Sequence, residues 1–66
     1  MKQFEIRSMT EHAHYKTVKT DDYAQAHRIF EKFKHFAKKH GIYLEVALWC
    51  DGWLCESVTI NPLLGN

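Results

Sequence analysis

A tight-turn sequence near the end of the chain, Asp51-Gly52, separates two short hydrophobic runs and constrains the fold more than any other feature. Aspartate followed by glycine between such runs is a strong indication of a β-hairpin. Gly52 can supply the positive φ of a three-residue loop, Cys50-Asp51-Gly52, built as a type I turn with a bulge. The loop length determines which residues of the two strands lie opposite each other, and therefore which side chains share a face.

This loop predicts strands over about 42–49 and 53–60, with Trp49 opposite Trp53. Because side chains alternate along a strand, counting outward from the loop divides the hairpin into two faces. The face toward a core is expected to contain Ile42, Leu44, Val46, Leu48, Leu54, Val58 and Ile60. The opposite face contains Tyr43, Glu45, Ala47, Trp49, Trp53, Cys55, Ser57 and Thr59. In this register Cys50 lies in the turn and Cys55 lies opposite Ala47, so no disulfide is expected.

The middle of the chain predicts a helix over about 21–40. Its apolar residues recur at three- and four-residue intervals and form one broad stripe: Tyr23, Ala26, Ile29, Phe30, Phe33, Phe36 and Ala37. Thr20 or Asp21 can cap the free amides at its start, and Gly41 can adopt the left-handed conformation that ends it. Phenylalanines on one face make this helix the main expected contributor to the core.

The N-terminal part of the chain predicts two more strands, over about 2–9 and 13–19. The first alternates between apolar and polar residues, which is the pattern of a half-buried strand. With Thr10-Glu11-His12 as the connecting loop, Phe4 is expected opposite Val18 and Arg7 opposite Tyr15.

The 66 residues are expected to form one domain, 1–66, of the α+β class. The order β-β-α-β-β implies a small, mostly antiparallel sheet with a single helix packed on one face. The other face of the sheet is then bare unless something else covers it.

The bare face is the first candidate site, with Trp49 and Trp53 as anchors and Tyr43, Tyr15 and Arg7 around them. Aromatic and arginine side chains are enriched at the centres of protein interfaces. The alternative is that the tryptophan pair only stabilises the hairpin. An interface on this face leaves two partners open, a second copy of the chain in a homodimer and a foreign protein.

A basic helix face is the second candidate site and supports an alternative function, nucleic-acid binding. Arg28, Lys32, Lys38 and Lys39 lie on the part of the helix that faces away from the core. Such a stripe could follow a nucleic-acid backbone. The alternative reading is a solvated helix face, and a net charge of +1 argues against a dedicated polyphosphate binder.

Metal binding and catalysis have little support in the sequence. His12 and His14 alternate on a strand and could chelate a metal ion, but no spacing supplies further ligands, so we expect no cofactor. Asp51 and Glu56 flank the cysteines and disfavour a reactive thiolate. No phosphate-binding loop or catalytic triad is present in the sequence, so we expect a binding protein and not an enzyme.

The chain begins with Met1-Lys2-Gln3 and no apolar leader follows, so we expect a complete small gene product in the cytoplasm with reduced thiols. No apolar run approaches the length that spans a bilayer, so no membrane role is expected.

The helix over Asp21–Gly41 and the hairpin over Ile42–Ile60 resemble, in architecture, small phage-encoded proteins that bind and inhibit host machinery. Anti-CRISPR proteins and phage inhibitors of host RNA polymerase include members built in this way. The resemblance covers most of the chain but involves no diagnostic motif. It implies an inhibitor that occludes a surface of a host complex, and it identifies no target.

Overall fold

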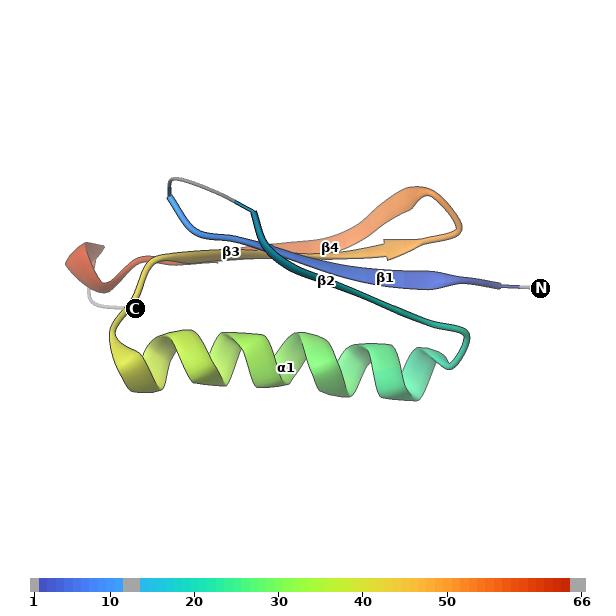
Figure 1. Cartoon of the computed structure of the whole chain (residues 1–66), viewed down its shortest axis with the longest axis horizontal. Helices are drawn as coiled ribbons and strands as arrows, with labels where there is room; N and C mark the ends of the chain where they lie inside the picture. The colour runs from blue at the N-terminus through green and yellow to red at the C-terminus, as the bar shows by residue number, and fades with distance from the viewer. Residues whose placement is uncertain (1, 12–13, 65–66) are drawn as a thin grey trace.

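The computed structural model describes residues 2–11 and 14–64. In these ranges the elements are strands β1 (Phe4–Met9) and β2 (His14–Thr20), helix α1 (Tyr23–His40), strands β3 (Leu44–Cys50) and β4 (Trp53–Ile60), and a short 3-10 helix, η1 (Pro62–Leu64). The described strands form one antiparallel sheet in the order β2-β1-β3-β4, and α1 lies along one face of it (Figure 1). The predicted α+β fold is confirmed.

Both ends of α1 are fixed by local hydrogen bonds. The cap at the start is Asp22, one residue after the expected positions, because its backbone is extended and its carboxylate accepts from the amides of Ala24 at 2.9 Å and Gln25 at 3.4 Å. At the other end Gly41 adopts the left-handed conformation at φ 62°, as predicted. The amide of Ile42 then donates to the carbonyl of Ala37 at 3.1 Å, which satisfies part of the last turn.

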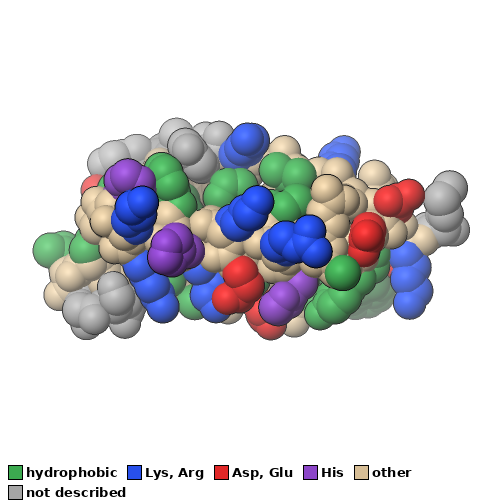
Figure 2. All heavy atoms as spheres, turned by 90° about the horizontal axis from the view of Figure 1, so that it is seen from below, with side chains coloured by type: hydrophobic (Ala, Val, Ile, Leu, Met, Phe, Trp, Pro, Cys, Tyr) green, Lys and Arg blue, Asp and Glu red, His purple; other side chains and the backbone are tan. Residues whose placement is uncertain are grey.

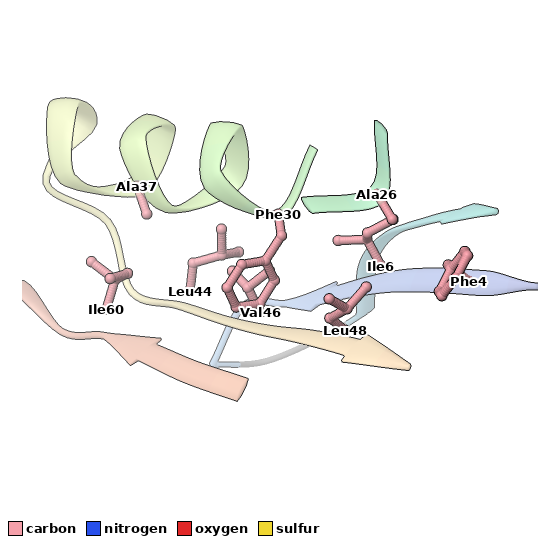
Figure 3. Packing of buried hydrophobic residues seen from close by; sticks show 9 residues of the cluster. All are labelled: Phe4, Ile6, Ala26, Phe30, Ala37, Leu44, Val46, Leu48 and Ile60. Atoms are coloured by element: carbon pink, nitrogen blue, oxygen red, sulfur yellow. The ribbon is translucent and has the colours of Figure 1, made fainter. Parts of the chain in front are cut away.

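The core lies between α1 and the central strands β1 and β3 (Figure 3). Phe30 is its largest fully buried side chain, and it projects from the helix toward the sheet. The other buried apolar residues are Phe4, Ile6, Ala26, Ala37, Leu44, Val46, Leu48 and Ile60. Tyr23 and Phe36 remain exposed, so the buried stripe of α1 is narrower than its apolar stripe.

One polar residue, Ser8, is buried among these side chains. Its hydroxyl donates to the carbonyl oxygen of Lys16 at 3.1 Å. The bond removes the cost of an unpaired buried hydroxyl and ties β1 to β2.

The register between β1 and β2 differs from the prediction by two residues. Phe4 lies opposite Thr20, and Arg7 lies opposite Thr17 and not Tyr15. An irregularity between Ser8 and Met9 accompanies a connection longer than the expected three residues. A shift of two keeps every regular side chain on its expected face, because the period of a strand is two.

The β3–β4 turn also differs from the prediction. It has two loop residues, Asp51 at φ 51° and Gly52 at φ 85°, which is the positive-φ pair of a type I′ turn. The backbone amide and carboxylate of Asp51 both bond to the backbone of Gln3, at 2.8 and 2.7 Å. This connection holds the start of the chain against the turn.

The shorter turn is compensated by an extra residue, Cys55, in β4. Trp49 lies opposite Leu54, but Leu48 lies opposite Glu56, so Cys55 is left without a residue across from it. The expected Trp49–Trp53 pair and the expected place of Leu54 on the helix side are therefore wrong. Leu54 moves to the face away from the helix, and Trp53, opposite Cys50, moves to the helix side.

The expectation that the cysteines are unbridged is also wrong. Cys50 and Cys55 form a disulfide across the hairpin, with their Cα atoms 6.1 Å apart. The prediction failed because it placed Cys50 inside the loop. In the structure Cys50 is the last residue of β3, and the bulge brings Cys55 near it on the neighbouring strand.

Candidate functional site

The helix covers one face of the sheet and leaves the other open. We call this open side the outward face. On β1, β3 and β4 it consists of three crosswise rows of side chains: Glu5, Trp49 and Leu54; Arg7, Ala47 and Ser57; Met9, Glu45 and Thr59. Strand β2 adds Lys19 to the first row and Thr17 to the second. Met9 is 47% exposed and Leu54 53% exposed, so apolar surface reaches solvent in the first and third rows.

Arg7 and Trp49 are stacked against each other on the outward face. The Arg7 guanidinium lies over the Trp49 ring, 4.5 Å from its centroid, and its Nη2 atom lies 3.0 Å from Oε2 of Glu5. The cation–π contact contributes about 0.5–1 kcal/mol at such a site, and the exposed ion pair less. Together they hold the guanidinium in a defined position before any partner arrives.

A shallow cavity of about 220 Å³ lies beside this pair. Met9, Ala47 and Trp49 give it an apolar floor, and Arg7 and Glu45 contribute opposite charges. Pockets for small-molecule ligands usually measure roughly 300–1,000 Å³. The cavity on the outward face is therefore better matched to one protruding side chain than to a cofactor.

Tyr43 lies just before β3 and is half-buried. Desolvation, followed by the charge and hydrogen bond of Glu45, raises the pKa of the Tyr43 phenol above its ordinary value of 10.0. The phenol is therefore neutral at physiological pH, and its O–H group donates to the Glu45 carboxylate.

The predicted partner-binding residues are thus only partly brought together. Arg7 and Trp49 are in contact, and Tyr43 is linked to the outward face through Glu45. Trp53 lies on the helix side at the hairpin tip, where it is 79% exposed. The side chain of Tyr15 lies outside the described part of the chain.

Leu54 is a member of the outward face that the sequence reasoning missed. The sequence did indicate the position of Leu54, because two-residue loops are the commonest hairpin connections for an Asp-Gly pair. A two-residue loop places Leu54 opposite Trp49.

The basic helix face lies on the opposite side of the molecule from the outward face. Five of the six charged residues in α1 are lysine or arginine, and Figure 2 shows their side chains and those of histidines spread along this side. A second shallow cavity, of about 410 Å³, is lined by Arg28, Glu31, Lys32, His35, Phe36, Lys39 and His40. Lys38 is also exposed, in the last turn of α1.

Metal coordination finds no support in the described residues, where no three His, Cys, Asp or Glu side chains are grouped closely enough to hold an ion. His12 and the side chain of His14 lie outside the description. Helix α1, within the part of the chain that the structure describes, is not apolar enough to cross a membrane.

Comparison of the chain with protein-family models, curated proteins and solved structures returned no match.

Proposed function

We propose that this chain is a non-enzymatic protein-binding module that contacts its partner through the outward face. The observation that carries the proposal is the Arg7–Trp49 stack beside a small cavity with an apolar floor. Tryptophan, tyrosine and arginine are enriched at binding hot spots, which lie in well-packed pockets surrounded by contacts that exclude water.

The same geometry favours inhibition by occlusion. Among the described residues the outward face offers a small cavity and an arginine–tryptophan stack, and such a face can cover a partner's surface. The architectural resemblance to phage-encoded inhibitors rests on α1 and the β3–β4 hairpin and agrees with this mode of action.

The proposal is tested by capturing partners from host-cell lysate with three immobilised chains. The wild type and Trp53→Ala are expected to retain the same protein, because Trp53 lies off the outward face. Arg7→Glu is expected to lose at least about 90% of it, since the change reverses the charge beside Trp49. Circular dichroism is the control that checks whether each variant is folded.

A second variant tests the outward face without changing the stacked residues Arg7 and Trp49. Met9→Glu places a carboxylate at a half-exposed position that lines the cavity. It is expected to weaken capture as Arg7→Glu does. Undiminished capture by both folded variants would exclude the outward face as the contact surface.

A second candidate, nucleic-acid binding by the basic helix face, is favoured by the concentration of positive charge on α1. Gel-shift titrations with a single-stranded oligonucleotide should then show affinity that falls steeply with added salt. Lys32→Glu with Lys39→Glu should abolish the shift, and Lys2→Glu with Lys19→Glu serves as the matched control. The absence of any shift at low salt would eliminate this candidate.

A further inference from the structure

The two edges of the sheet are protected from other strands in different ways. Edge strand β2 carries Lys16 and Lys19, and lysine on an edge opposes pairing with a further strand. Edge strand β4 contains neither lysine nor proline; the bulge at Cys55 and the charge of Glu56 protect its first part, and residues 57–60 carry no such device. Every residue of β4 from Trp53 to Ser57 is exposed.

Two large apolar side chains of the described residues are strongly exposed on either side of β4. Trp53, its first residue, is 79% exposed, and Leu63, three residues beyond its last residue and in η1, is 92% exposed. Their separation along β4 is informative, because antiparallel pairing of two identical strands brings opposite ends together.

We propose that the β4 edge pairs with the β4 edge of a second copy of this chain, antiparallel and about a two-fold axis. With the axis at Ser57 or Val58, Trp53 of each copy lies near residues 61–63 of the other. The two most exposed apolar groups are then covered in two equivalent clusters, as an isologous interface requires.

Charge is compatible with this arrangement. In the same two registers Glu56 lies opposite Val58 or Ile60 and not opposite Glu56 of the second copy. Like charges directly opposite in a sheet are destabilising, and here that repulsion is avoided. The regular part of β4, Glu56–Ile60, supplies the ladder, since the bulge at Cys55 ends it on the other side.

The helices leave room for the pairing. Helix α1 packs chiefly over β1 and β3 and little over β4. With strands about 4.8 Å apart, the axes of the two helices would be separated by about 19 Å, more than the helix diameter of roughly 10–12 Å. The space between them is on the helix side of the sheet, the side to which the register assigns Trp53.

This pairing is independent of the proposed function, because the outward face stays open on both copies. The dimer would present two outward faces on one continuous sheet. A partner with two matching sites would then bind with an effective-concentration advantage.

The test is the molar mass of the purified chain alone, measured by sedimentation equilibrium over a range of concentrations. The wild type is expected to reach twice the mass of one chain. Ser57→Lys with Thr59→Lys is expected to raise the dissociation constant of the dimer at least tenfold, because in either register a new lysine of one copy lies opposite a new lysine of the other. Ala24→Lys with His35→Lys adds the same groups to exposed positions on α1 and should leave the dimer intact.

Two further measurements keep the test decisive if the lysine variant folds poorly. Trp53→Ala should weaken the dimer while retaining partner capture, whereas Arg7→Glu should lose capture and remain dimeric. Hydrogen exchange should show β4 amides whose protection rises with concentration. A monomeric wild type would overturn the proposal and leave the edge open to a strand from another protein. A dimer insensitive to both the lysine pair and Trp53→Ala would also overturn it and place the dimer contact elsewhere on the chain.

Discussion

Strands β3 and β4 belong to one hairpin and both contain large apolar side chains, yet their environments differ. In β3 every second residue from Leu44 to Leu48 is buried, whereas β4 is exposed from Trp53 to Ser57 and only its last residue, Ile60, is fully buried. The difference follows from position, because β3 lies between two strands under the helix and β4 lies at the edge. The buried side chains of β3 therefore stabilise the fold, while the exposed side chains of β4 are available for contacts between molecules.

The largest expected effect comes from making the same substitution in both strands. Leu48→Ala in β3 removes a side chain that is 1% exposed, and we expect it to lower the free energy of unfolding by about 3 kcal/mol. Leu54→Ala in β4 removes one that is 53% exposed and should cost less than about 1 kcal/mol. Urea denaturation of the two variants measures both values, and equal losses would contradict the assignment of the two strands.

The disulfide provides the second comparison, because it joins the end of β3 to the start of β4. Closing a loop of five residues is expected to contribute about 2 kcal/mol by restricting the unfolded chain. Cys50→Ser with Cys55→Ser should lower stability by that amount. A reducing agent should destabilise the wild type equally and leave the double variant unchanged, so an effect of the reductant on both proteins would show that it acts elsewhere.

The two tryptophans give a smaller effect of the same kind. Trp49→Ala loses the Arg7 stack and the cross-strand contact with Leu54, and we expect a loss of about 1.5 kcal/mol. Trp53→Ala at a site 79% exposed should change stability by less than about 0.5 kcal/mol. Both values are measured at low protein concentration, where association makes no contribution. A larger loss for Trp53→Ala than for Trp49→Ala would indicate that the bulge is misplaced.

The smallest effect concerns Tyr43, at the entrance to β3. Because desolvation and Glu45 raise the pKa of its phenol in the folded state, the neutral form stabilises the fold. That contribution is complete below the ordinary pKa of 10.0 and is lost as the pH rises through the folded value. Tyr43→Phe should remove this part of the alkaline decline in stability, whereas an unchanged profile would show that Tyr43 makes no contribution to it. Thermal melts at a series of pH values measure both profiles.

Much of the fold could be predicted because it depends on periodicity. The apolar spacing around Phe30 identifies the helix, and the alternation around Ile6 and Val46 identifies the strands that face it. Strand order could not be predicted, since nothing local to β1 indicates that it pairs with both β2 and β3. The register shifts of two residues also had no signature, because they leave side chains on the same face.

The candidate site was harder to predict because it depends on single residues at the hairpin tip. Choosing a three-residue loop over a two-residue loop with a bulge reversed the faces of Trp53 and Leu54 and hid the Cys50–Cys55 bond. Both loops satisfy the Asp-Gly sequence and the alternation further along the strands. The pairing of Arg7 with Trp49 followed from the β1–β3 alignment, which joins residues far apart in the sequence.

The hydrogen bonds between Gln3 and Asp51 have a consequence for how the chain folds. They join two residues that are 48 positions apart in the sequence, at one end of the β1–β3 strand pair. The two hairpins and α1 depend on contacts between residues close in sequence and can form early, but the β1–β3 pair requires the first and last thirds of the chain to meet. We therefore expect the joining of the two hairpins to set the folding rate, with the turn that carries Asp51 docking onto the N-terminal strand in the slowest step.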